Sequence, residues 1–372
     1  MFHEERSVET ESESVASERR MVLSQERLTR AKTAFTTRNV KLQGRLQLCT
    51  FSKPEPGDLV LARVEKLGQH QKLESPHGRR AEMYEGDEIL VAFGQRYAPD
   101  QFESIVPSDL GACELVAAGG LASKVISKHS RMRRATRIQP VGLVADPSGR
   151  VFNLRHFALR SRVCPASRPR VVAVAGTSMN AGKTTTAAGI IHGLARAGLK
   201  VAAAKVTGTG SGNDLWSMLD AGASRVLDFT DMGFPSTAGM ALGKTESIAA
   251  SLVAHLADNR PDVIVLEIAD GLFQRETAAL LTSPLLRSLV DGVIFASADA
   301  MGALAGREWL LRRGHHVLAI SGLFTASPLA RLEAEEAMGQ KVCTLEQLRD
   351  PLHAPTIVFC STKSDGILRA AE

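Results

Sequence analysis

The sequence predicts an α/β protein: a mostly parallel sheet with helices on both faces, preceded by a smaller β-rich domain. After residue 170, apolar strands alternate with amphipathic helices, and this alternation is typical of a parallel sheet covered on both faces. Residues 36–160 instead hold short β-type runs separated by Gly-Asp and Pro-Ser-Gly turns. The 372 residues are enough for two ordinary domains.

Four consecutive segments are expected along the chain. Residues 1–35 are rich in Glu, Ser and Arg and are predicted to form a disordered tail. Residues 36–160 form the β-rich domain, which is expected to hold a substrate or a partner and to contain a helical insertion at 119–132. A basic, proline-containing linker at 161–170 leads to the α/β domain at 171–372.

Within the α/β domain the elements can be predicted in order. A buried strand at 170–176 runs into a Gly-rich turn and then into an amphipathic helix that ends at Gly198. Further elements are expected as strands at 200–206, 261–269, 291–298 and 316–322, and as helices at 302–314 and 327–339.

The stretch VAVAGTSMNAGKTTTAAGII, residues 173–192, nearly matches the phosphate-binding pattern G-x-x-x-x-G-K-[ST]. Gly176 stands one residue too early, and Thr177 occupies the position of the first glycine. A strand that runs through such a turn into a helix points backbone N–H groups at one spot, which binds phosphate. Lys183 would neutralise the β- and γ-phosphates, and the Thr184 hydroxyl would face Mg²⁺. The nucleotide-binding residues are therefore expected to be Gly176, Thr177, Ser178, Met179, Asn180, Ala181, Gly182, Lys183, Thr184 and Thr185.

A loop with this longer spacing resembles that of dethiobiotin synthetase and the cobyric acid synthases, in the MinD-like class of P-loop proteins. AAAKVTGTG supplies Lys205 and Thr209 at the spacing of that family, and GSGNDLWSM supplies Asp214 near the start of a helix. FTDMGFPSTAG is similar to the family's next loop, and VIVLEIADG supplies Glu267 at the end of a strand. The resemblance covers about residues 171–345.

This resemblance implies an ATP-dependent ligase or synthase that forms a homodimer and activates a carboxylate or carbamate for amide or ring formation. Lys183 and Lys205 would flank the transferring phosphoryl group, and Thr209 would face an anionic second substrate. Mg²⁺ would be held by Thr184, Asp214 and Glu267. The scattered cysteines separately predict a cytoplasmic protein.

The alternative is a nucleotide-switched protein that uses ATP or GTP to deliver a cofactor or metal to a protein partner. GTSMNAGKT lacks the additional early lysine of MinD-type switches, which counts mildly against that kind of ATPase. STKSDG at 361–366 is similar to the Thr-Lys-x-Asp element with which signal-recognition-particle GTPases read guanine, although a surface turn is the favoured interpretation.

Composition also bears on metal sites, disulfides, membrane spans and binding partners. Five scattered cysteines without metal-ligand spacing argue against a zinc site or a disulfide framework, and no apolar run has the length of a membrane span. A basic stretch at 127–137 predicts either a solvated face or an anionic partner. Nucleic acid is disfavoured because no aromatic residues interleave with these cations.

Overall fold

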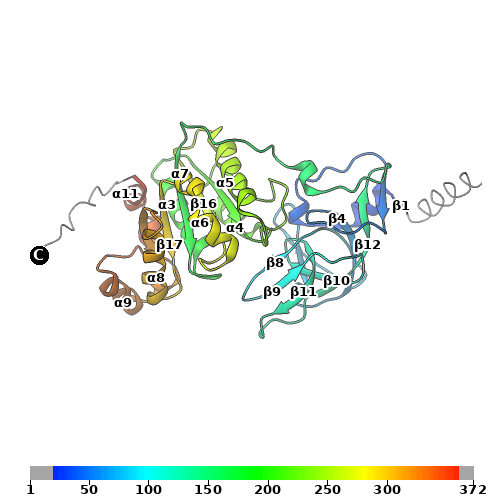
Figure 1. Ribbon diagram of the computed structural model, residues 1–372, viewed down its shortest axis with the longest axis horizontal. Coiled ribbons are helices and arrows are strands. Elements are labelled where there is room, and N and C mark those ends of the chain that lie inside the picture. The colour runs from blue at the N-terminus through cyan, green and yellow to red at the C-terminus, as the bar shows by residue number, and fades with distance from the viewer. Residues whose placement is uncertain (1–19, 360–372) are drawn as a thin grey trace, which may run out of the picture. The chain divides into compact units, whose positions relative to one another are not determined.

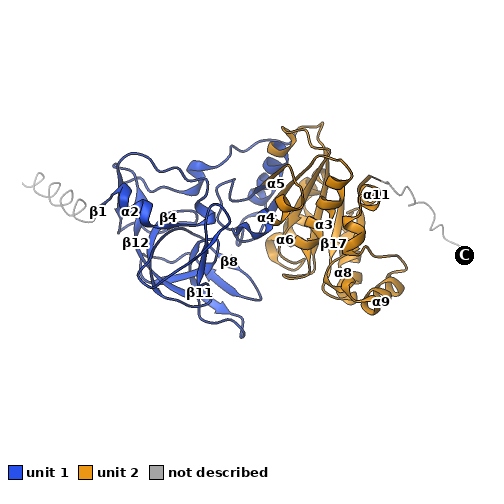
Figure 2. Ribbon diagram, turned by 180° about the vertical axis from the view of Figure 1, so that it is seen from behind, with its two compact units in different colours: residues 1–164, 205–216, 227–254 blue, residues 165–204, 217–226, 255–372 orange. Residues whose placement is uncertain are grey.

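The computed structural model describes residues 20–359. It divides into two compact units, of which unit 1 contains residues 1–164, 205–216 and 227–254 (Figure 2). Unit 2 contains residues 165–204, 217–226 and 255–372. Two segments that follow the phosphate-loop stretch in sequence therefore pack within the N-terminal unit. The segment boundaries expected from the sequence remain a prediction.

The α/β part is built on a six-stranded sheet of order β15-β14-β16-β13-β17-β18. The pairs β13–β16, β13–β17 and β17–β18 are parallel. The chain is therefore a mixed α/β protein, and parallel pairing holds along four neighbouring strands. The strands are β13 (Arg170–Gly176), β14 (Val201–Thr207), β15 (Arg225–Asp228), β16 (Val263–Ile268), β17 (Gly292–Ala296) and β18 (Val317–Ser321).

Helices cover the two faces of β17 in unit 2 (Figure 1). Ile294 lies in one buried apolar cluster with Ile190 and Leu194 of α3 (Lys183–Arg196). Successive side chains of a strand point to opposite faces, so Phe295 faces the other way. There it meets Gly306 of α8 (Ala300–Leu311), where an added Cβ would lie 2.1 Å from the ring. The remaining helices are α4 (Gly212–Asp220), α5 (Leu242–Ala257), α6 (Arg275–Thr282), α7 (Pro284–Leu289), α9 (Pro328–Met338), α10 (Leu345–Arg349) and α11 (His353–Phe359).

Unit 1 is built on a ten-stranded sheet of order β1-β3-β12-β4-β7-β11-β9-β8, with β10 and β2 paired beside this path. In β4, Val60 and Ala62 enter one buried cluster while Leu59 and Leu61 enter another. This alternation gives the sheet an apolar core on each face. The strands are β1 (Arg20–Leu23), β2 (Lys32–Thr33), β3 (Leu46–Cys49), β4 (Leu59–Lys66), β7 (Glu88–Phe93), β8 (Arg96–Tyr97), β9 (Phe102–Ile105), β10 (Cys113–Ala117), β11 (Leu121–Lys128) and β12 (Thr136–Ala145), with a separate hairpin of β5 (Lys72–Glu74) and β6 (Arg80–Glu82).

The helical insertion predicted at 119–132 is wrong, because its central part is strand β11. This strand pairs antiparallel with β10 and β9, and its adjacent Val125 and Ile126 are β-branched residues that favour strands. The sequence predicts a disordered tail at residues 1–35. In the described part of this segment, residues 20–35 instead form β1, α2 (Gln25–Arg30) and β2. The STKSDG stretch lies outside the described residues.

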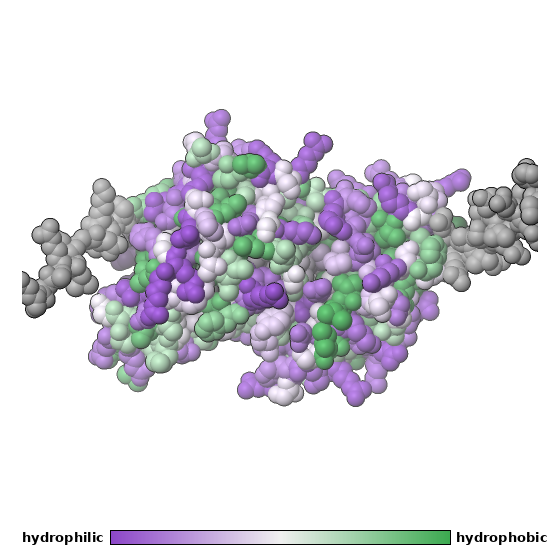
Figure 3. Space-filling view, viewed as in Figure 1, coloured by the Kyte–Doolittle hydropathy of each residue, from purple (hydrophilic) through white to green (hydrophobic). Residues whose placement is uncertain are grey.

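The face seen in Figure 3 is mostly polar, with apolar side chains exposed over the region of β9 and β11. Ile105 and Ile126 are 48% and 58% exposed there. Within residues 20–359, no helix combines the length and the apolar character needed to cross a bilayer.

Candidate functional site

The predicted phosphate loop connects the end of β13 at Gly176 to the start of α3 at Lys183. A Cβ on Gly176 would lie 2.7 Å from Cγ of Lys183 and 2.8 Å from the Ala296 carbonyl oxygen, so only glycine fits. Gly182 adopts φ +94°, a left-handed conformation that glycine tolerates without strain. Asn180 has φ 62°, and Asn is among the residues that enter this region most readily. The longer loop therefore closes without disrupting either element.

Backbone hydrogen bonds hold the loop against the ends of two neighbouring strands. The Thr177 N–H donates to the Ala296 carbonyl at 3.0 Å, at the end of β17. The Leu323 N–H, just after β18, donates to the Ala181 carbonyl at 3.1 Å. Both anchors come from the carboxyl ends of parallel strands, where ligands of open α/β sheets bind.

The Lys183 side chain reaches back across the loop that precedes it. It is 6% exposed, and its ammonium donates to the Ser178 carbonyl at 2.7 Å. A positive charge is thereby held inside the turn at the amino end of a fourteen-residue helix. The charge and the helix dipole both favour an anionic group at this place.

Thr184 and Glu267 form a pair of oxygen donors beside the loop. The Thr184 hydroxyl donates to Oε1 of Glu267 at 2.9 Å, and Glu267 is 2% exposed near the end of β16. The chain after β16 also approaches the loop, because a Cβ on Gly271 would lie 2.4 Å from the Thr177 carbonyl oxygen. Hydroxyl and carboxylate oxygens are the ligands that Mg²⁺ prefers, so this donor set fits the predicted metal.

A cavity of about 470 Å³ adjoins the loop within unit 2. Its size lies in the range of about 300–1,000 Å³ that is usual for small-molecule sites. Thr185 and Thr186 of α3 form one wall, and the residues after β18 form another. Thr185 is among the residues predicted from the sequence to bind nucleotide, whereas the wall after β18 was not predicted, because only a glycine after the strand end marks it locally. The other polar lining residues are Ser321, Thr325, Arg331, Thr344, Glu346 and Arg349.

The remaining predicted site residues lie in unit 1. Lys205, near the end of β14, is 8% exposed and forms an ion pair with Asp214 in the first turn of α4. Thr209 pairs with Ser236 as a single antiparallel β-bridge outside the named strands. The predicted residues therefore fall into two groups, each brought together within its own unit: the phosphate loop with Thr184 and Glu267, and Lys205 with Asp214.

The basic stretch is exposed around the connection from β11 to β12. Arg137 pairs with Glu65 at 2.6 Å. The exposed cations are Lys128, Arg131, Arg133, Arg134 and Arg137.

No protein-family model matches the chain, and no curated protein matches it. Among solved structures, the chain is similar to the signal recognition particle receptor FtsY from Elizabethkingia anophelis in complex with GDP, at 16% identity and a TM-score of 0.34, over 55% of this chain and 67% of that one. It is also similar to the 54 kDa signal recognition particle protein from Aeropyrum pernix K1 in complex with GDP, at 20% identity and a TM-score of 0.34. That alignment covers 53% of this chain and 48% of the Aeropyrum protein. The resemblance to dethiobiotin synthetase and the cobyric acid synthases remains a prediction.

Proposed function

We propose that the chain is a Mg²⁺-dependent P-loop NTPase that binds a nucleoside triphosphate at residues 176–185. The observation that supports this most is the closed turn at the amino end of α3, with Lys183 buried inside it. Backbone N–H groups and the Lys183 ammonium would stabilise charge on the phosphates. Thr184 and Glu267 would hold Mg²⁺, which when bound neutralises phosphate charge and orients the terminal phosphoryl group.

The cavity beside the loop is the proposed place of the base and ribose. Its walls mix hydroxyls, one carboxylate and two guanidinium groups with apolar side chains. These groups can accept or donate hydrogen bonds to either purine, so both ATP and GTP are candidate ligands.

Of the two functions considered from the sequence, we favour the nucleotide-switched one. The segments that carry Lys205, Thr209 and Asp214 pack within the N-terminal unit. In a switch, residues of this kind would pass the state of the nucleotide to a neighbouring domain and from there to a protein partner. Delivery of a cofactor or metal to such a partner would fit this arrangement.

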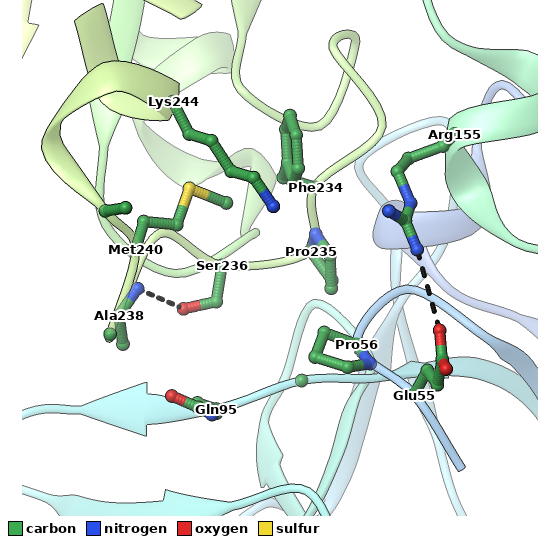
Figure 4. Close-up of a pocket in the computed structure, with 13 residues that line it drawn as sticks. Glu55, Pro56, Gln95, Arg155, Phe234, Pro235, Ser236, Ala238, Met240 and Lys244 are labelled. Carbon is green, nitrogen blue, oxygen red and sulfur yellow. Dashed lines mark hydrogen bonds and ion pairs between the residues drawn. The ribbon is translucent and has the colours of Figure 1, made fainter.

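A ligase acting on an anionic small molecule is the second candidate, and one observation favours it. Unit 1 contains a cavity of about 430 Å³. Figure 4 shows Lys244 and Arg155 on two sides of it, with Phe234 and Pro235 between them. Arg155 lies 3.9 Å from Glu55. Two cations on either side of apolar side chains would suit a carboxylate or phosphate that carries an apolar body.

Hydrolysis and binding of ATP and GTP, each with and without Mg²⁺, test the proposal. We expect Lys183→Ala to lower turnover by about a hundredfold or more, because it removes the cation that would stabilise the transferring group. Glu267→Gln should lower Mg²⁺-dependent turnover and leave the fold intact. Lys341→Ala is the matched control, since this lysine is 89% exposed on the same unit.

The outcomes separate the two functions. Steady hydrolysis by the protein alone supports the switch, whereas tight binding that turns over only after a carboxylate or amine acceptor is added supports the ligase. Equal nucleotide affinity of the wild type and Lys183→Ala would show that the phosphate-loop assignment is wrong.

A further inference from the structure

Two loops of unit 1 are joined to each other by backbone and side-chain hydrogen bonds. The first, residues 207–214, carries Thr209 and ends at Asp214. The second, residues 228–237, follows β15. The Gly208 N–H donates to the Thr237 hydroxyl at 2.8 Å, and the Gly210 N–H donates to the Pro235 carbonyl at 2.9 Å. The two loops therefore form one hydrogen-bonded element.

The β-rich part of unit 1 contacts the first loop through a buried carboxylate. Glu74, at the end of β5, is 1% exposed. Its Oε2 accepts from the Ser211 hydroxyl at 3.1 Å and from the Gly212 N–H at 3.0 Å. Gly212 is the first residue of α4, so Glu74 caps this helix from 138 positions away in the chain. A carboxylate at this end also interacts favourably with the helix dipole.

The packing around this cap leaves no room for a side chain at Gly212. A Cβ on Gly212 would lie 2.5 Å from Oε1 of Glu74 and 2.4 Å from the Trp216 indole nitrogen. Trp216 in turn packs edge-on against Phe35, with ring centroids 6.4 Å apart. A Cβ on Gly119 would lie 2.1 Å from the Gly210 carbonyl oxygen. The start of α4 is thus fixed by contacts with three parts of the β-rich fold.

The second loop is held by a cation. Arg38 is 11% exposed and pairs with Asp228 at 3.0 Å and with Asp231 at 2.8 Å. Its guanidinium also lies 4.2 Å from the centre of the Phe35 ring. Phe35 therefore contacts both the residue that holds the second loop and the tryptophan of α4.

We propose that Glu74 is a positioning residue of the nucleotide site: by capping α4 it fixes the Asp214 carboxylate against the Lys205 ammonium. This inference rests on the proposed function and on the prediction from the sequence that Asp214 holds Mg²⁺ and Lys205 flanks the phosphoryl group. The β-rich part is then more than a partner-binding module, because it determines the position of residues that act on the nucleotide. Loss of the cap would release the first turn of α4 and with it the Lys205–Asp214 pair.

Steady-state kinetics of Glu74→Ala, Glu74→Gln and Ser211→Ala test this proposal in the full-length protein. A small misplacement of catalytic groups costs about a hundredfold in rate, so Glu74→Ala should lower kcat by about ten- to a hundredfold. The KM for the nucleotide should change by less than about threefold, since the phosphate loop is untouched. Glu74→Gln keeps an acceptor oxygen and should recover part of kcat, and Ser211→Ala removes one of the two hydrogen bonds and should have a milder effect. Glu82→Gln, on the partner strand of the same hairpin and 53% exposed, is the matched control.

Trp216 gives an independent readout of the same region. In a Trp309→Phe background it is the only tryptophan of the chain, which has two. Addition of MgATP or MgGTP should change its fluorescence, and Glu74→Ala should abolish that change. If Glu74→Ala folds and keeps wild-type kcat and the fluorescence response, Glu74 has no positioning role. If instead the wild type binds no nucleotide, the proposed function itself fails.

Discussion

Gly322 follows β18, and its replacement by alanine tests the geometry of the phosphate loop most directly. It adopts φ 113° and ψ −166°, a conformation that is essentially restricted to glycine. An added Cβ would lie 2.4 Å from the Ser297 nitrogen and 2.7 Å from the Ala181 carbonyl oxygen, and neither backbone atom can move without moving a strand end or the loop.

The cost of Gly322→Ala has two parts. The disfavoured backbone conformation costs about 1–3 kcal/mol. Forcing a methyl group into packed surroundings costs about another 1–3 kcal/mol. Gly339 is the matched control: it has φ 63° at the end of α9 and no atom within 4 Å of an added Cβ. Gly339→Ala should therefore cost only about 1–2 kcal/mol, the penalty of the left-handed conformation.

Urea unfolding of both variants measures these costs, and titration with a fluorescent nucleotide measures binding. Because Ala181 would be displaced, Gly322→Ala should weaken nucleotide binding at least tenfold, whereas Gly339→Ala should leave it unchanged. If the two variants lose the same stability and bind nucleotide equally well, the loop is not supported by the end of β18 and the argument is wrong.

Two further predictions concern unit 1. Arg38→Met should destabilise the fold by about 3–5 kcal/mol, because it leaves the buried Asp228 and Asp231 carboxylates without their cation; urea unfolding beside the exposed Arg63→Met variant tests this, and equal effects would contradict it. The pKa of His70 is lowered to about 4, first by burial and then by the charge of Arg96, although its hydrogen bond to the Val116 carbonyl acts in the opposite direction. Since the unfolded chain takes up this proton near pH 6.5 and the folded chain does not, stability should fall by up to about 3 kcal/mol between pH 6.5 and 4. His70→Asn should flatten that part of the profile, and an unchanged profile would show that His70 is not the group responsible.

The phosphate loop could be predicted from the sequence because everything that defines it is local. The strand, the two glycines, the lysine and the helix stand within one stretch of chain, and their spacing predicts a turn whose backbone N–H groups point at one spot. The position of Glu267 beside the loop could be predicted as well, since a polar residue at the end of a buried strand lies at the carboxyl edge of the sheet; its role in binding Mg²⁺ stays a prediction. The prediction of a helix at 119–132 was wrong because the conformation of this segment is not determined locally. Its helical pattern was weak, and pairing with β9 and β10 decided the conformation instead.

The supports of the site could not be predicted, because they depend on which strands become neighbours. Gly322 matters only since β18 lies next to β17, and no local pattern of residues contains that information. Nothing in the local sequence marks Glu74 or Arg38, yet each is held against a partner far along the chain, 138 positions away for Gly212 and 190 for Asp228. Burying such a charge is costly unless the partner is in place, so each contact makes the loop it holds depend on the β-rich fold. Residues predicted to act on the nucleotide are thus held in position by a part of the chain that contains no recognisable nucleotide-binding motif.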